Sequence, residues 1–403
     1  MSSGSDRRES DRRVFLLRAG LSAFGDNMMS PYVGVYAVQL GASPADMGWL
    51  RSLQNLSSTT MELVWGLAVD KIGRPVLFVF LGAFLGGLLW FPYLLVKTPQ
   101  QITVLAVVQL VLMSMAGSAS LTVNDRLVPR SRRSQGVAEF HTAWMLGTIP
   151  ATLIAGYLMS RVKDNLAAMY SLPIVLAGLF RAGSALLVWP MMRRERRVAV
   201  RSPVSILRNI GGVVQNPSLR TLYVISLFQG FFMSAAWPLF PIANVIVTKN
   251  DMLLIALLST VNTVVSSLTR PYFGRLADRF GKKPVLILGR IGIALVPFSY
   301  AFATEFWHLV VASIVTGLFM MADSVTQAYI LENTGRDSVA TSLSFYGMVY
   351  GVATFFGSLV GGHLVNELLI QGYDVGRALT IGFLFSAVGR VVTGIAYGKL
   401  KED

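Results

Sequence analysis

The chain has 403 residues, of which 53% are hydrophobic and only 14% charged, and its formal net charge is +14. An average soluble domain is roughly 25% charged, so this composition nearly excludes a water-soluble enzyme of this size. The sequence holds no cysteine, which excludes disulfides, thiolate metal sites and cysteine nucleophiles.

Apolar stretches long enough to cross a membrane recur along the whole chain. A bilayer core of about 30 Å needs about 20 mostly apolar residues per helix. The predicted spans are residues 14–39, 48–68, 76–96, 101–123, 136–159 and 171–192, followed by 221–247, 252–273, 284–303, 306–331, 339–364 and 377–398. We therefore predict an all-α polytopic membrane protein with twelve transmembrane helices.

Most of the Lys and Arg residues that lie outside these spans fall on the side of the membrane that holds both termini. The positive-inside rule then predicts that both termini are cytoplasmic. The first apolar stretch is too long for a signal peptide, so we expect a cytoplasmic tail and a retained helix. The net charge is thereby explained by topology, and we expect no nucleic-acid partner.

A long polar connection, residues 193–220, divides the chain into two similar halves. We predict an N-terminal six-helix bundle over 1–192, a cytoplasmic middle loop over 193–220 and a C-terminal six-helix bundle over 221–403. Residues 66–77 read GLAVDKIGRPVL, and residues 274–286 read GRLADRFGKKPVL at the equivalent place. Repeated halves of this kind are typical of transporters with a substrate site near the membrane midplane.

The loop G-x-x-x-D-[RK]-x-G-[RK], present in both halves, resembles the signature of the major facilitator superfamily, and the resemblance covers the whole chain. It implies two pseudo-symmetric six-helix bundles and secondary transport by alternating access. Its implied partners are a small-molecule substrate and the lipid bilayer. We expect a multi-pass protein of a prokaryotic plasma membrane that acts as a monomer.

The repeated loop would form a cytoplasmic latch. A carboxylate after a helix end can lie against the positive N-terminus of a neighbouring helix. By the resemblance, Asp70 would meet the start of a helix near Ser338, and Asp278 would meet one near Gln135. The alternative is that these acids are solvated loop charges.

The resemblance also implies two bridges within the latch. Arg74 would link Asp70 to Asp125, and Lys282 would link Asp278 to Glu332. Gly73 and Gly281 would permit the tight turn that each loop needs.

Two acids inside predicted spans have no counterpart in the other half. Asp26, beside Asn27, lies near the middle of 14–39, and Asp323, one turn before Gln327, lies in 306–331. A charge at the bilayer centre costs about 2.5–3.5 kcal/mol on insertion scales. We therefore expect each acid to have a structural or functional role that offsets this cost. We predict that Asp26 is the principal proton-coupling carboxylate and that Asp323 is the second candidate; a structural hydrogen bond is the alternative for both.

Charged residues with counterparts in both halves suggest roles in the fold. Arg181 and Arg390 occupy equivalent positions, and each is either a counter-ion for a buried acid or a substrate contact.

Glu139 and Arg270 lie at similar depth near the cytoplasmic side. By the resemblance their spans meet across the bundle interface, so the two would form a gate pair, unless each extends separately to the headgroups.

Further polar and aromatic residues would line the substrate cavity or, more often, pack helices together. Trp237-Pro238 and Pro241 also interrupt helical hydrogen bonding and predict a kink in 221–247. The candidate lining residues are Gln229, Trp237, Asn244, Asn262, Tyr346 and Tyr350.

The sequence contains no protease, hydrolase or Walker motif, so we expect neither an enzyme nor an ATP-driven pump. The three histidines lie far apart, so we expect no metal site, and no cofactor beyond an ion gradient, taken to be protons. Residues 104–123 lack the arginine of proton-driven drug antiporters, and PMMRRERR replaces the sugar-porter signature, so no subfamily is assigned.

The leading hypothesis is therefore a proton-coupled exporter of a small organic or amphiphilic compound. The alternatives are a proton-coupled importer or facilitator of a small nutrient and, with less support, a transporter-like receptor.

Overall fold

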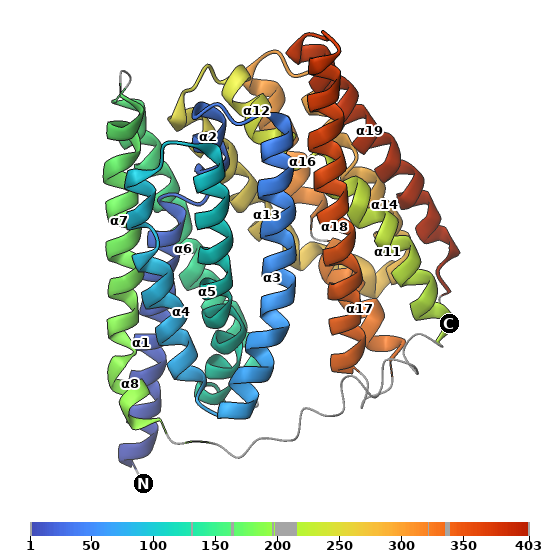
Figure 1. Ribbon diagram of the computed structural model, residues 1–403. Helices are drawn as coiled ribbons and strands as arrows, with labels where there is room; N and C mark the ends of the chain where they lie inside the picture. Colours follow the sequence, from blue (N-terminus) through green and yellow to red (C-terminus); the bar gives the residue numbers. More distant parts are fainter. Residues whose placement is uncertain are drawn as a thin grey trace. The chain divides into compact units, whose positions relative to one another are not determined.

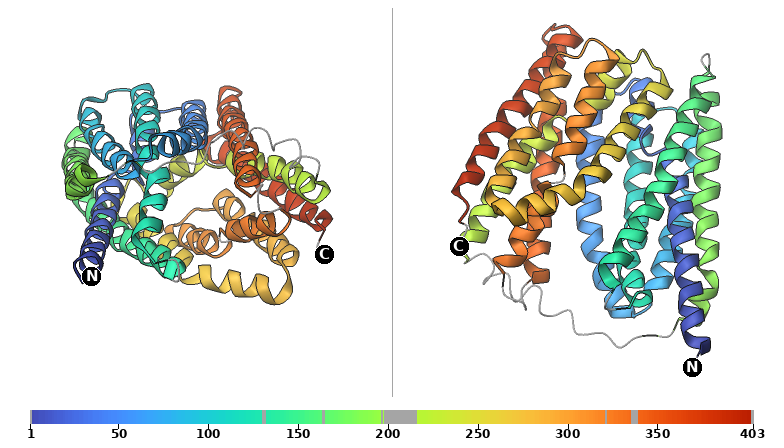
Figure 2. Two further views of the ribbon diagram at one scale, coloured as in Figure 1. Left: turned by 90° about the horizontal axis from the view of Figure 1, so that it is seen from below. Right: turned by 180° about the vertical axis from the view of Figure 1, so that it is seen from behind.

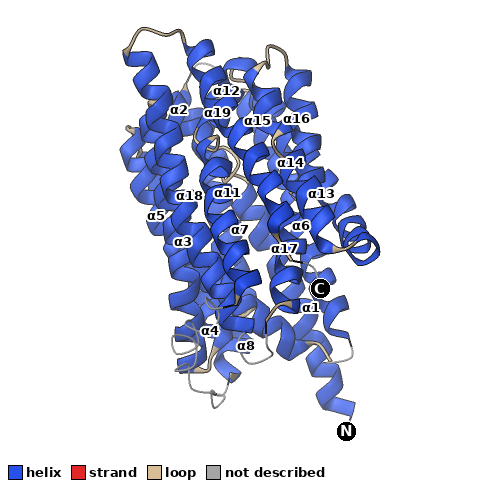
Figure 3. Cartoon of the chain, turned by 90° about the vertical axis from the view of Figure 1, so that its right-hand side faces the viewer, coloured by secondary structure: helices blue, strands red, loops and turns tan. Residues whose placement is uncertain are grey.

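The computed structural model is built from helices joined by short loops (Figure 1). It describes residues 2–129, 132–162, 165–195, 197, 216–320, 322–334 and 339–401, and these residues contain no strand (Figure 3). The elements before the middle loop are α1 (Ser2–Asn27), α2 (Val33–Gln39), α3 (Pro44–Ile72), α4 (Pro75–Leu88), η1 (Phe91–Leu95), α5 (Pro99–Leu127), α6 (Arg133–Ser160), α7 (Leu166–Leu187) and α8 (Trp189–Arg194).

The elements after the middle loop are again helices, and the counterpart of α5 is divided into two. They are α11 (Pro217–Ala235), α12 (Leu239–Val247), α13 (Met252–Phe280), α14 (Lys282–Gly292), α15 (Leu295–Ala301), α16 (Phe306–Phe319), α17 (Ala322–Glu332), α18 (Val339–Ile370), α19 (Val375–Ala396) and η4 (Tyr397–Lys399).

The chain divides into two compact units, Met1–Val33 with Thr60–Pro203, and Gly34–Thr59 with Val204–Asp403. The first half of α3 thus belongs to the second unit. There the Ser52 hydroxyl donates to the Phe355 carbonyl of α18 at 2.7 Å, and Gly48 lies against Gly362. The predicted boundaries at 192 and 221 stay a prediction.

Ten helices in the described ranges are long and apolar enough to cross a membrane, and they match the predicted spans from 76–96 onward. The first two predicted spans are not among them. A break after Asn27 splits residues 14–39 between α1 and the short α2, and α3 carries many Ser, Thr, Asn and Gln residues. Twelve spans and cytoplasmic termini therefore stay predictions.

Polar side chains start several of these helices. The residue before the first turn accepts a hydrogen bond from the backbone of that turn at Thr98, Asn165, Asn216, Asp251 and Asp374. Such caps satisfy backbone donors that have no partner inside the helix. They fix where α5, α7, α11, α13 and α19 begin.

Proline breaks the first span of each repeat at equivalent places. α1 ends at Asn27, four residues before Pro31, and α11 ends at Ala235, three residues before Pro238. Proline cannot donate a backbone hydrogen bond, and its ring displaces the carbonyl four residues earlier. The predicted kink in residues 221–247 is confirmed.

Glycine allows two helix pairs to approach backbone to backbone. A Cβ at Gly147 of α6 would overlap the Gly20 carbonyl of α1. A Cβ at Gly357 or Gly361 of α18 would overlap the Phe231 or Ala235 carbonyl of α11 in the same way. Gly357 and Gly361 therefore permit the close approach of α11 and α18.

Candidate functional site

The first compact unit, Met1–Val33 with Thr60–Pro203 and here called the N-terminal unit, buries an ion pair beside the break after α1. The other is called the C-terminal unit. Asp26 of α1 pairs with Arg181 of α7, and the two residues are 7% and 5% exposed. Each charge is therefore almost fully removed from water, and each depends on the other for compensation. Arg181 is the counter-ion of Asp26.

The Asp26 carboxylate uses only one of its oxygens in this pair. Oδ2 faces Arg181, whereas Oδ1 is buried and has no hydrogen-bond partner among the described residues. The neighbouring Asn27 amide donates to the Ala23 carbonyl at 2.9 Å and to the Thr148 hydroxyl at 3.1 Å, which ties the end of α1 to α6. Oδ1 is thus a buried acceptor available for a proton or a donor group.

A second buried arginine, which is not among the predicted site residues, lies two turns before Asp26. Arg18 is 4% exposed, its guanidinium lies 5.4 Å from the Phe15 ring centre, and its Nε and Nη1 have no hydrogen-bond partner in the described part of the chain. Arg18, Arg181 and Asp26 together leave one uncompensated positive charge. In the sequence, Arg18 could have been found as a charged residue inside the apolar stretch 14–39.

The C-terminal unit places Asp323 on a different arginine, also not selected from the sequence. Arg290 of α14 donates to Asp323 and to the Thr326 hydroxyl of α17, both at 2.8 Å. The Arg290 side chain is 3% exposed and that of Asp323 is 45% exposed. The carboxylate therefore lies at the edge of the unit and the guanidinium behind it.

Aromatic rings surround this pair. Tyr346 and Tyr350 of α18 stack with ring centres 5.9 Å apart and lie within electrostatic range of Arg290 and Asp323. The Arg290 guanidinium lies 5.6 Å from the Tyr397 ring centre. The structure thus joins three predicted candidates, Asp323, Tyr346 and Tyr350, into one cluster.

Arg390 matches Arg181 in position but binds backbone instead of an acid. It is 1% exposed and donates to the Ile293 carbonyl at 3.0 Å and the Met233 carbonyl at 2.7 Å. Met233 precedes Pro238 by the same five residues that separate Asp26 from Pro31. A carbonyl exposed by a helix break therefore replaces the carboxylate, and Arg390 holds broken helices together.

The remaining lining candidates mostly bond within their own unit. Gln229 accepts from Thr393 at 2.5 Å, Asn244 accepts from Tyr300 at 3.0 Å, and Asn262 accepts from Ser266 at 3.4 Å. Gln229 is fully buried, Trp237 packs on a small apolar cluster, and Gln327 is exposed. These contacts favour helix packing for Gln229, Asn244 and Trp237.

The two repeated loops have the backbone that the glycines predict. Gly73 has φ 71° and Gly281 has φ 87°, a region that residues with a side chain rarely adopt. Lys282 Nζ lies 2.5 Å from Glu332 Oε1, which is one contact of the predicted bridge. Asp70, Asp125 and Asp278 are exposed, and Ser338 lies outside the described residues, so the contacts of the latch acids stay predictions.

A carboxylate that is not among the predicted site residues holds the start of α4. Glu195 accepts from the backbone N–H groups of Val76 and Leu77 at 2.9 and 3.2 Å, and it lies 3.7 Å from Arg126. Arg74 donates nearby to the Met192 carbonyl at 3.1 Å. The signal was a single acid within the basic run RRERR.

Glu139 has a partner on α1. It forms an ion pair with Arg12 and accepts from Gln135 at 3.0 Å. Arg270 is exposed on α13, in the other unit. The gate pair of Glu139 and Arg270 stays a prediction.

Comparison with known sequences agrees with the resemblance that the two repeated loops indicate. A model described as Major Facilitator Superfamily matches residues 15–242 and 222–396. The class H tetracycline resistance protein of Pasteurella multocida is 27% identical over 155 residues, which cover 37% of this chain and 38% of that protein. The class B protein of Escherichia coli is 25% identical over 153 residues, 36% of this chain and 37% of its own length. The chain thus matches well under half of each relative.

Comparison with solved structures shows the fold. The crystal structure of the nucleoside transporter NupG superposes with a TM-score of 0.75 at 15% identity, covering 97% of this chain and 100% of that chain. A bacterial homologue of the human lysosomal transporter Spinster, inward-facing and unoccupied, gives a TM-score of 0.69 at 13% identity, covering 98% of both chains.

Proposed function

We infer the function from one premise: the chain belongs to the Major Facilitator Superfamily and is a membrane transporter of small solutes. We propose that it is a secondary active transporter that uses alternating access. We further propose that protons drive it, that it exports a small organic or amphiphilic compound, and that it acts as a monomer in a prokaryotic plasma membrane without an organic cofactor or metal.

The observation that carries the proton coupling is the buried Asp26 carboxylate. Its Oδ2 faces Arg181 and its Oδ1 has no hydrogen-bond partner among the described residues. A proton on this carboxylate would remove the charge that compensates Arg181, so protonation and the ion pair exclude each other. Arg390, at the equivalent place, binds carbonyls that do not take up protons. This difference supports Asp26 over a site shared by both halves.

One similarity supports export. Both tetracycline-related proteins are named for resistance, which export of a drug would confer. Tetracycline is therefore the first probe to use.

The test is a proton flux measurement on purified protein in liposomes that contain a pH-sensitive dye and an acidic interior. We expect tetracycline to accelerate alkalinisation of the interior for the native protein and not for Asp26→Asn. Asp323→Asn is the matched control, because it removes the second candidate for the coupling carboxylate. Coupling intact in Asp26→Asn and lost in Asp323→Asn would transfer the role to Asp323.

A further inference from the structure

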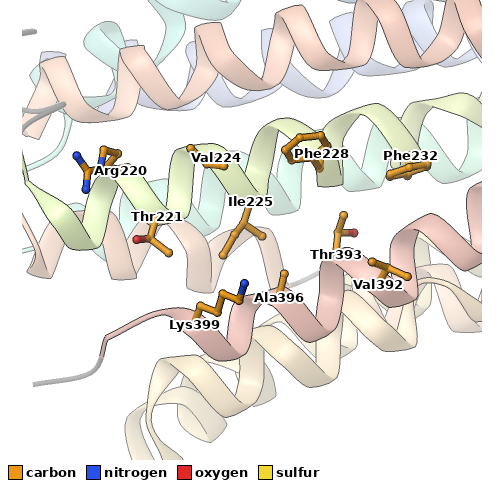
Figure 4. A pocket seen from close by; sticks show the side chains of 10 residues that line it. All are labelled: Arg220, Thr221, Val224, Ile225, Phe228, Phe232, Val392, Thr393, Ala396 and Lys399. Carbon is orange, nitrogen blue, oxygen red and sulfur yellow. The ribbon is translucent and has the colours of Figure 1, made fainter.

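A groove of about 460 Å³ runs between α11 and α19 in the C-terminal unit (Figure 4). The two helices lie side by side in both views of Figure 2. Arg220, Thr221 and Lys399 line one end of the groove, and Val224, Phe228 and Val392 line the rest. The groove thus has a cationic end and an apolar body.

Helix periodicity explains this division. Arg220, Val224, Phe228 and Phe232 recur every four residues, so they share one face of α11. Because α11 begins at Pro217 and η4 ends at Lys399, the first turn of one helix lies beside the last turn of the other. The two basic side chains therefore both lie toward one end of an apolar channel.

The apolar body is unusually open and long. Val224, Phe228 and Val392 are 52%, 53% and 61% exposed. A second hollow of about 470 Å³ continues the groove beyond Phe232, because the two hollows share Phe232 and Val392 in their linings. From Arg220 to Phe232 the channel measures about 18 Å at ~1.5 Å per residue, close to the ~15 Å hydrocarbon depth of one leaflet.

We propose that this groove binds an anionic phospholipid, with an acyl chain along the channel and the phosphate between Arg220 and Lys399. No acidic residue lines the groove within the described part of the chain, so a headgroup with net negative charge meets only cations. A zwitterionic headgroup would bring its own cation toward them. The site lies in the cytoplasmic leaflet, which rests on the predicted orientation, and basic pockets there favour anionic headgroups.

Native mass spectrometry of the detergent-purified full chain tests whether the two cations select an anionic headgroup. Dioleoyl phosphatidylglycerol should bind more tightly than dioleoyl phosphatidylcholine. Arg220→Gln with Lys399→Gln should weaken phosphatidylglycerol binding about 25-fold, from roughly a fivefold contribution per cation. Arg275→Gln with Lys401→Gln, two exposed cations outside the groove, is the matched control. Equal binding of the two lipids, or an equal loss in the control, would overturn the proposal.

A second pair of variants tests the channel without changing charge. Val392→Trp fills the groove and should reduce binding of both lipids, whereas Ile395→Trp, on the same helix and also 61% exposed, lies outside it and should leave both unchanged. Full phosphatidylglycerol binding by Val392→Trp would refute the acyl-chain site. If glycerol 3-phosphate binds Val392→Trp as tightly as phosphatidylglycerol binds the native chain, the site is one for free phosphate instead.

Discussion

Replacing Asp26 and Arg181 singly and together separates a structural ion pair from a coupling site. Asp26→Asn leaves Arg181 buried without an acid, and Arg181→Gln leaves Asp26 buried without a cation. The double variant keeps two neutral amides of similar shape in the same place. Neither replacement carries a charge, and neither titrates.

The burial of the pair sets the size of the effect. Because the two residues are 7% and 5% exposed, a charge left alone is almost fully desolvated. Removing one partner of a buried pair costs about 3–5 kcal/mol, while replacing both is often close to neutral. For a unit of 150–250 residues each single variant should lower Tm by roughly 6–20 °C. The Tm of the double variant should be closer to the Tm of the native protein than that of either single variant.

Thermal unfolding and proton-driven accumulation are measured on the same preparations. We expect the double variant to regain stability but not accumulation, because no carboxylate remains to carry the proton. Additive losses in Tm would refute the ion pair as the source of stability. A stable double variant that still accumulates substrate against its gradient would show that Asp26 is structural.

Three further predictions concern other contacts. Asp278→Asn removes a latch acid and should speed the labelling of a cysteine introduced on the cytoplasmic side of this cysteine-free chain; unchanged labelling would contradict the latch. Gly357→Ala forces a methyl group against the Phe231 carbonyl and should cost about 1–3 kcal/mol in thermal unfolding, whereas Gly347→Ala meets open space on the same helix and should not. Arg390→Met takes the guanidinium donors from the Met233 and Ile293 carbonyls; the Ile293 carbonyl keeps the Val296 N–H at 3.3 Å, so the loss falls mainly on Met233 and should cost about 1–3 kcal/mol, and a native Tm would show that water replaces the guanidinium.

The helices and their breaks could be predicted from the sequence because both are local properties. Hydropathy marks the apolar stretches, and Pro238 marks the kink between α11 and α12. Gly73 and Gly281 likewise mark turns that require positive φ. Each of these features depends on residues within a few positions of one another.

The partners of buried charges could not be predicted in the same way. Which arginine meets Asp323 depends on how α14 and α17 are rotated, and Arg290 is the one that does. The partners of Arg390 are backbone carbonyls, which no residue type reveals. Glu195 reaches α4 from more than a hundred residues away. Long-range packing decides all three.

The glycine contacts of α1 with α6, and of α11 with α18, restrict how the protein can move. At Gly147, Gly357 and Gly361 a carbonyl of one helix lies where a methyl group would otherwise be. Sliding either pair by one residue would drive a neighbouring side chain into that carbonyl. The two helices of each pair must therefore move together as one rigid body during the transport cycle. Cysteine cross-links placed along these seams should form equally well in every state of the cycle.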